Sequence, residues 1–268
     1  MEPETKDSLV RSMLDWFQQD SPQAWAALSG WPRRTPDERR RLLRGLMNLR
    51  GPAPVPIGVA DDQDRLLRAE ISERGLIEAM SLAPLASDQR LALWRGDITR
   101  LRADAIVNAA NAQLLGCFMP LHHCIDNAIH SAAGMGLRAE CARIMAERGR
   151  PEPTGTATLT QGHCLAARHI VHTVGPIVRG APTPEQCRQL ASCYASCLAA
   201  AAGAGARSIA VCCISTGEYG FPQQEAARVA LTALRAELGN HPTIERVVLN
   251  VFTGTDQAIY RSLLGPDA

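Results

Sequence analysis

The chain has 268 residues, of which 46% are hydrophobic, and its formal net charge is +1. This composition is typical of a globular protein with one large core, and it excludes fibrous and disordered chains. The near-zero net charge also argues against a nucleic-acid partner, because such proteins usually carry a basic excess or a basic stripe. We therefore expect any phosphate group to be recognised locally, by backbone amides.

The nine cysteines are odd in number and scattered, unlike the disulfide framework of a small secreted domain. We expect most of those other than Cys117 and Cys124 to be buried free thiols. The N-terminus shows no basic segment followed by an apolar run, and no stretch approaches the roughly 20 apolar residues of a membrane span. The sequence thus predicts a soluble, cytoplasmic protein with no membrane partner.

Residues 1–88 show helical patterns only. Between Ser8 and Gln19 four large side chains fall on one helical stripe, namely Leu9, Met13, Trp16 and Phe17. Thr35–Glu38 reads as a capping box with proline at the first helical position. Residues 51–56 are rich in proline and should run extended, and helical spacing resumes around Asp64–Ile71. We predict a helical N-terminal extension of two or three helices, an annex to the rest of the chain.

From residue 89 onward, short strand-like runs alternate with helical segments, which is the pattern of a sheet covered by helices on both faces. The candidate strands are Leu91–Thr99, Ala105–Asn108, Gly155–Thr160, His169–Val174, Ser208–Ile214 and Arg246–Phe252. The candidate helices lie near Cys124–Arg148, Pro184–Ala202, Pro222–Leu238 and Thr255–Leu264. Since open α/β sheets bind ligands beyond the carboxyl ends of their strands, the polar segments that follow these strands are candidate sites.

Two such segments carry amides and a carboxylate. After the first strand, Gly96 allows a tight backbone and Asp97 presents a carboxylate that could accept a hydrogen bond from the exocyclic amine of a base. A turn with an Asx-type contact would explain Asp97 equally well. Asn108 and Asn111 end the next strand, and a pair of amides at this spacing suits the vicinal hydroxyls of a ribose.

The run from Cys117 to Cys124 holds three potential zinc ligands within eight residues: two thiols and either His122 or His123. Its spacing does not match the paired two-cysteine knuckles of structural zinc sites. Three ligands with one open position are typical of a catalytic metal. The deaminase signature is absent. Core thiols beside surface histidines remain the alternative.

The strand that ends at Ile214 leads into a glycine-spaced loop and then into a helix with proline in its first turn, at Pro222. Successive amides beside a helix N-terminus form an anion site suited to a diphosphate. The loop is neither a P-loop nor a dinucleotide fingerprint. Its aromatic residues, Tyr219 and Phe221, could stack on a sugar or base or belong to the core. The same two readings apply to Phe252, at the end of the last strand.

Together these segments resemble the macrodomain family of ADP-ribose-binding modules, and more narrowly its zinc-containing microbial branch of protein-ADP-ribosyl hydrolases. The resemblance is carried by Gly96–Thr99, Asp104–Asn111, Leu115–Phe118, Pro120, His122, Cys124–His130, His172–Pro176, Ile214–Gly217 and Phe221–Pro222. In the extension, Leu42–Asn48 and Gln63–Leu67 also look like that branch. The resemblance implies an α/β fold, a three-layer α/β/α macrodomain of residues 89–268 with a mixed, mostly parallel sheet, preceded by the helical extension of residues 1–88.

The resemblance also implies roles for individual residues. Asp97 would read the adenine amine, and Gly217–Phe221 would cradle the diphosphate. The implied substrate-binding residues are Asp97, Ile98, Asn111, Asn127, Ser215, Thr216, Gly217, Glu218, Tyr219, Gly220, Phe221 and Phe252. The implied catalytic residues at the distal ribose are Asp126, Asn111 and Asn108, and the implied ligands of one zinc ion are Cys117, His122 and Cys124.

The activity that the resemblance implies is the hydrolytic removal of mono-ADP-ribose from modified protein side chains, in particular from ester-linked Asp or Glu, with ADP-ribose as product. The cleaved bond would join the anomeric carbon of the distal ribose to the side chain. Asp126 is the carboxylate expected to orient or activate the water, and zinc could activate the water or position the ribose. Two alternatives stay open, a reader module without turnover and a deacylase of O-acyl-ADP-ribose.

Overall fold

A six-stranded sheet forms the centre of the computed structural model, which describes residues 1–265. The predicted main domain runs to residue 268, and its last three residues lie outside the described part. In spatial order the strands are β2 (Leu91–Arg95), β8 (Arg246–Val251), β7 (Ser208–Val211), β4 (Ala105–Ala109), β6 (His169–Thr173) and β5 (Ala157–Gln161). Only β5, at one edge, runs antiparallel to its neighbour. The predicted mixed, mostly parallel sheet is confirmed.

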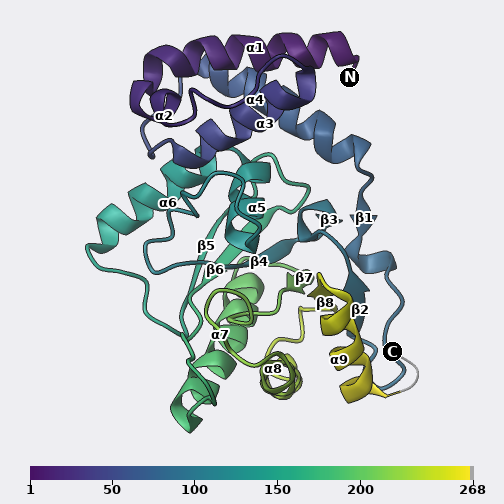
Figure 1. The fold of residues 1–268 in the computed structure, drawn as a ribbon. Coiled ribbons are helices and arrows are strands. Elements are labelled where there is room, and N and C mark those ends of the chain that lie inside the picture. Colours follow the sequence, from purple (N-terminus) through teal and green to yellow (C-terminus); the bar gives the residue numbers. More distant parts are fainter. Residues whose placement is uncertain (266–268) are drawn as a thin grey trace.

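Helices cover both faces of this sheet (Figure 1). Helices α7 (Pro184–Gly203), α8 (Gln223–Leu238) and α9 (Gly254–Leu264) pack on one face. The other face carries α5 (Ile125–Ala133) and α6 (Met135–Arg148). The three layers confirm the predicted α/β/α architecture.

Helices α5 and α6 correct the single helix predicted over Cys124–Arg148. The helix is interrupted at Gly134, whose φ of 91° is a left-handed value that favours glycine. A Cβ at this position would lie 2.4 Å from the Gln63 amide nitrogen. The break therefore allows the N-terminal extension to approach the backbone closely, which helical periodicity alone does not reveal.

Two further differences concern short elements. The first predicted strand ends at Arg95, and the 3-10 helix η2 (Ile98–Arg100) follows it. Strand β1 (Ile77–Glu78) pairs in parallel with β3 (Leu101–Arg102), and the 3-10 helix η1 (Ala79–Ser81) follows β1. Two-residue strands show no alternation, so the sequence contains no periodic signal for them.

The N-terminal region folds into four helices, where two or three were expected. They are α1 (Pro3–Asp20), α2 (Pro22–Ala27), α3 (Pro36–Leu49) and α4 (Ile57–Glu73). The predicted capping box at Thr35 is confirmed by reciprocal bonds with Glu38. Helix α2 has only six residues, too few to show a helical repeat.

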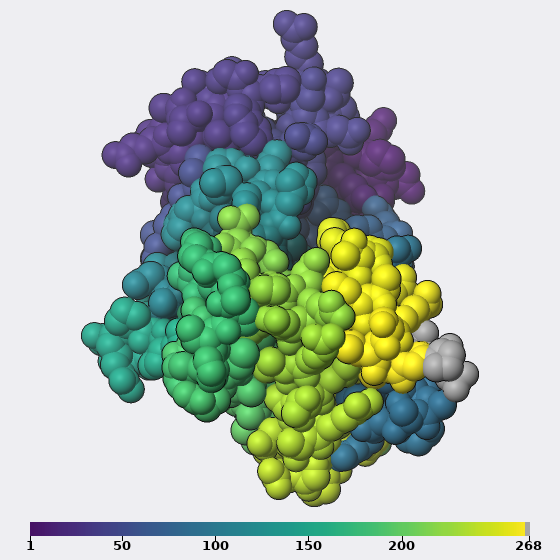
Figure 2. Space-filling view, turned by 60° about the horizontal axis from the view of Figure 1, so that its bottom comes forward, coloured from purple at the N-terminus to yellow at the C-terminus, as the bar shows by residue number. Residues whose placement is uncertain are grey.

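These helices form a layer of their own beyond α5 and α6 (Figure 1). Figure 2 shows the purple N-terminal residues at one end of the molecule, against the teal segment. They share a second hydrophobic core that also takes in Met135 and Cys164 from the main domain. A domain boundary at residue 88 remains a prediction. Within residues 1–265, no helix has the length and apolar character needed to cross a bilayer.

Candidate functional site

A cavity of about 750 Å³ opens beyond the carboxyl ends of the parallel strands. This volume lies within the range of small-molecule and cofactor sites, and the position is the one expected for open α/β sheets. The predicted site residues that line it are Asp97, Ile98, Asn111, Cys117, His122, Cys124, Asp126, Ser215, Thr216, Gly217, Glu218, Tyr219 and Phe252. The structure thus brings together residues from strand ends that lie far apart in the sequence.

The carboxylate of Asp126 is held by two amide side chains. Asn108 donates to its Oδ1 at 2.8 Å, and Asn111 donates to its Oδ2 at 3.3 Å. Asp126 lies in the first turn of α5 and is 5% exposed. Burial raises the pKa of Asp126 to about 6, against the lowering effects of Asn108 and the Arg138 charge. Because each amide binds one carboxylate oxygen, the two amides together fix the orientation of the carboxylate.

Asn111 also links Asp126 to the loop that follows β4. Its Nδ2 also donates to the Gly116 carbonyl at 3.1 Å, and its Oδ1 accepts from the Gln113 amide at 3.0 Å. Gly116 has a φ of 79°, and a Cβ there would lie 2.8 Å from the His130 ring. Only glycine lets the loop pass this close to α5.

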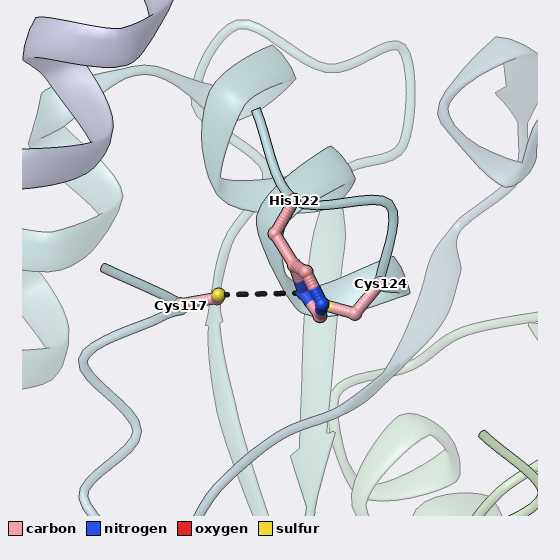
Figure 3. Close-up of side chains that lie close together, drawn as sticks. All are labelled: Cys117, His122 and Cys124. Atoms are coloured by element: carbon pink, nitrogen blue, oxygen red, sulfur yellow. Dashed lines mark hydrogen bonds between the residues drawn. The ribbon is translucent and has the colours of Figure 1, made fainter. Parts of the chain in front are cut away.

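Cys117, His122 and Cys124 point toward one another at the rim of the cavity (Figure 3). Their ligand atoms all lie within 4.8 Å of one another. Cys117 Sγ and His122 Nδ1 are 3.6 Å apart. Tetrahedral bonds of about 2.3 Å to sulfur and about 2.0 Å to nitrogen separate two such atoms by about 3.6 Å. The donor set and this spacing therefore fit a zinc ion, with His122 and not the exposed His123 in the group.

The surroundings of this group are suited to a cation. Cys124 is the N-cap of α5, and its Sγ accepts from the Asn127 amide at 3.4 Å. Burial raises the pKa of the Cys124 thiol to about 12, which a bound cation would reverse because coordinated thiols are deprotonated. Glu218 Oε1 lies 3.6 Å from His122 Nε2, so the loop that contains Glu218 reaches the same rim.

A second cluster of potential ligands lies behind Asp126. The ligand atoms of His130, Cys141 and His172 also fall within 4.8 Å of one another, and all three side chains are buried. His172 Nδ1 is 3.1 Å from Asn108 Nδ2, and His172 Nε2 is 2.9 Å from Thr160 Oγ1. Since the Asn108 amide can only donate, Nδ1 accepts and Nε2 carries the proton. Both ring nitrogens of His172 are thus engaged in hydrogen bonds that orient Asn108.

The loop after β7 has the form expected of an anion cradle. The Phe221 amide donates back to the Ser215 carbonyl at 2.9 Å, and the Gly220 amide to Gly217 at 2.9 Å. The amides of Gly217, Glu218 and Tyr219 donate to no protein acceptor among residues 1–265. Ser215 adopts a φ of 66°, and its buried hydroxyl also has no partner in the described chain. Strained backbone and free donors at one loop are typical of a ligand site.

Asp97 and Phe252, from the ends of the paired strands β2 and β8, also line the cavity. Asp97 Oδ1 accepts from Thr99 N at 3.0 Å and from Thr99 Oγ1 at 2.7 Å, so the Asx-type contact is present. Its Oδ2 faces Arg74 Nη1 at 3.4 Å. Phe252 is 73% exposed, which rules out the core alternative for this ring. An exposed aromatic face beside a carboxylate provides both stacking and hydrogen bonding for a base.

Four predicted residues do not line the cavity. Asn108 and Asn127 are buried and do not line it, and they bind other side chains. Gly220 lies in the loop behind the lining residues, and the Phe221 ring is 1% exposed in the core, which favours the core alternative for its side chain.

Sequence reasoning assigned no role to several other lining residues, namely Arg44, Phe118, Ile125, Asn250 and Asp256 among others. Asn250 could have been found, because a polar residue in an otherwise apolar strand is a signal. Arg44 has no such signal, since it lies on α3 and reaches the cavity only through tertiary packing.

Comparison with known proteins gives consistent matches. The macro domain family model matches residues 107–230. A curated protein-ADP-ribose hydrolase from Treponema medium is 44% identical over 230 residues, covering 85% of this chain and 88% of that protein.

Two solved structures are similar as well. The Trypanosoma brucei macrodomain in complex with ADP-ribose has a TM-score of 0.64 and 31% identity, covering 87% of this chain and 97% of that one. The Oceanobacillus iheyensis macrodomain with ADP has a TM-score of 0.58 and 38% identity, covering 65% of this chain and 89% of that one.

Proposed function

Because the chain belongs to the macro domain family, we propose that it is a protein-ADP-ribose hydrolase that removes mono-ADP-ribose from modified side chains, in particular from ester-linked Asp or Glu. The curated relative reported above carries the name of this activity. We propose a cytoplasmic location, in keeping with nine free cysteines, of which five of the seven outside the Cys117–Cys124 run are buried.

The observation that carries the proposal is the meeting of two chemically active groups on one cavity wall. Asp126, held by two amides, lies two residues after Cys124, so the N-terminus of α5 carries the thiol at its N-cap and the carboxylate in its first turn. A module that only binds a nucleotide needs the Asp97 end and the diphosphate loop. It does not need an oriented carboxylate beside three potential metal ligands.

The chain's own residues account for the hydrolytic step. Asp126 would orient a water and take its proton as the water oxygen bonds to the anomeric carbon of the distal ribose. The bond from that carbon to the ester oxygen breaks, and the Asp or Glu carboxylate of the modified substrate protein leaves with the bonding electrons. Asn108 and Asn111 hold the Asp126 carboxylate in place, which lowers the entropy cost of reaching the reactive geometry.

Binding of the nucleotide part would fix the distal ribose at Asp126. The free amides of Gly217, Glu218 and Tyr219 would receive the diphosphate, and Asp97 with Phe252 would receive the adenine. Cys117, His122 and Cys124 would hold one zinc ion, which when bound would supply Lewis-acid polarisation at the ribose or a more acidic water.

The direct test offers the purified protein three ADP-ribosylated substrates, linked through acidic residues, serine and arginine, with and without a metal chelator. We expect release of ADP-ribose from the acidic linkage and loss of release with chelator. Binding of ADP-ribose with no release from any substrate would contradict the hydrolase assignment and identify a reader. Release of acetate from O-acetyl-ADP-ribose, without release from proteins, would identify a deacylase instead.

A further inference from the structure

The segment that carries the proposed metal ligands has little structure of its own. Residues 115–124, called here the ligand loop, contain no helix or strand. Leu121 has a φ of 56°, a left-handed value that is strained for a non-glycine residue. Leu121 directly precedes His122. A loop with such a residue keeps its shape only where surrounding groups hold it.

The group that holds Leu121 comes from the N-terminal extension. Asn48, at the end of α3, accepts a hydrogen bond from the Leu121 amide at 3.0 Å. Its Nδ2 donates to Ser131 Oγ on α5 at 2.9 Å. Asn48 is 1% exposed, so neither bond competes with bulk water. The side chain thus links α3, α5 and the ligand loop.

Arg138 ties the beginning of the loop to the same end of α3. Its Nε donates to the Leu115 carbonyl at 2.7 Å, and its Nη1 donates to the carbonyls of Met47 and Asn48 at 3.1 and 3.0 Å. These carbonyls belong to the last turn of α3, where no intrahelical donor is available. The Phe118 ring lies 4.2 Å from the Arg138 guanidinium, beside Cys117.

A third anchor fixes the middle of the loop. Asn127 Nδ2 donates to the Met119 carbonyl at 2.9 Å, and its Oδ1 accepts from Arg44 Nη2 at 2.9 Å. Arg44 also belongs to α3 and lines the cavity. All three anchors of the ligand loop therefore contact the stretch of α3 from Arg44 to Asn48.

We infer that the C-terminal half of α3 contributes to the metal site by setting the conformation of the ligand loop. Asn48 is the positioning residue that orients His122 toward the metal. This inference rests on the proposed metal site. The N-terminal extension is then required for the metal affinity of the main domain, beyond any contribution to its stability.

The test compares four variants of the full-length chain. Asn48→Leu keeps the side-chain volume and removes both hydrogen bonds. Asn48→Asp keeps an acceptor for the Leu121 amide and can accept from the Ser131 hydroxyl. Ser131→Ala removes the bond from Asn48 to α5 and the longer 3.3 Å bond that Ser131 Oγ donates to Asn127 Oδ1, and it leaves the bond from Leu121 to Asn48 in place. Arg40→Ala is the matched control, because it removes an ion pair between α3 and Glu70 without touching the ligand loop.

The primary measurement is the zinc dissociation constant, obtained by competition with a chromophoric chelator. We expect it to rise about 10- to 100-fold in Asn48→Leu, as is usual for lost outer-shell partners, and to stay within about threefold of wild type in the other three variants. The visible absorption of bound cobalt should change in Asn48→Leu and be restored in Asn48→Asp. Hydrogen exchange of the Leu121 amide should accelerate in Asn48→Leu alone.

Zinc affinity and cobalt absorption of Asn48→Leu equal to wild type would overturn the inference and leave the proposed function intact. A wild-type chain that binds neither zinc nor cobalt would overturn the zinc assignment and the inference together. Should Asn48→Leu fail to fold, Asn48→Ala removes the same two bonds at the cost of a small cavity, and the same two readouts apply to it.

Discussion

Two clusters of cysteine and histidine lie near Asp126, and they differ in what surrounds them. In the outer cluster Cys117, His122 and Cys124 are half-buried and face the cavity. The inner cluster, which consists of His130, Cys141 and His172, is fully buried. Each cluster brings three potential ligand atoms within 4.8 Å, so proximity alone does not distinguish a metal centre from a packed core.

Access from the cavity distinguishes them, and so does the hydrogen bonding of His172. The ring nitrogens of His172 are taken up by Asn108 and Thr160. Burial lowers the pKa of His172 to about 3 and raises the pKa of Cys141 to about 12, so both side chains stay neutral in the core. The outer ligands sit on a loop at the cavity rim, where a cation can enter and a fourth position can open to substrate. We therefore propose a metal role for the outer cluster and a supporting role for the inner one.

The largest expected effect concerns the outer thiols. The double substitution Cys117→Ser, Cys124→Ser should reduce the metal content from about one zinc per chain to near zero, because two of the three ligands lose their thiolates. Metal analysis of the purified protein measures this. Full zinc content in the double variant would show that the outer cluster does not hold the metal.

The next effect concerns the residue near both clusters. Asp126→Ala should lower the turnover of the ester-linked substrate about 100- to 10,000-fold, since the carboxylate that activates water is gone. Its dissociation constant for ADP-ribose should stay within a few-fold of wild type, as calorimetry can check. Wild-type turnover would show that the carboxylate has no part in the step.

A substitution in the inner cluster should lower the stability of the fold and leave the zinc content unchanged. His172→Leu leaves the Asn108 amide and the Thr160 hydroxyl without their buried partner, which should lower the free energy of unfolding by about 2–4 kcal/mol. Urea denaturation measures the loss. Zinc content should remain about one per chain, and a loss of zinc in the folded variant would contradict the division of roles.

The smallest effect is expected at the inner thiol. Cys141→Ser places a hydroxyl in a buried site and should cost about 1 kcal/mol of unfolding free energy. Zinc content and turnover should both equal those of wild type. It is the matched counterpart of the outer serine variants, because the same atom is exchanged, and a drop in zinc content here would mean that the inner cluster also holds metal.

Much of the fold was predictable from local patterns. The strands and the long helices follow from periodicity, and the capping box at Thr35 follows from four adjacent residues. The break at Gly134 was not predictable, because it depends on the approach of Gln63 from the extension. For the same reason the extension looked like an annex: nothing local in Arg44 or Asn48 indicates which residues they will contact.

The sequence by itself determined which chemical groups the site contains, because the residues that follow strand ends must meet at one edge of a parallel sheet. It placed Asp97, Asn111 and Asp126 at the same cavity, and beside them it placed Cys117, Cys124 and one of two adjacent histidines. Only the tertiary structure decided between alternatives that share a sequence signal. It exposed Phe252 and buried Phe221, brought His122 into the ligand group ahead of His123, and tied the ligand loop to α3. The physical reason is that burial and long-range hydrogen bonds depend on what packs against a residue, and that partner is set by the whole chain.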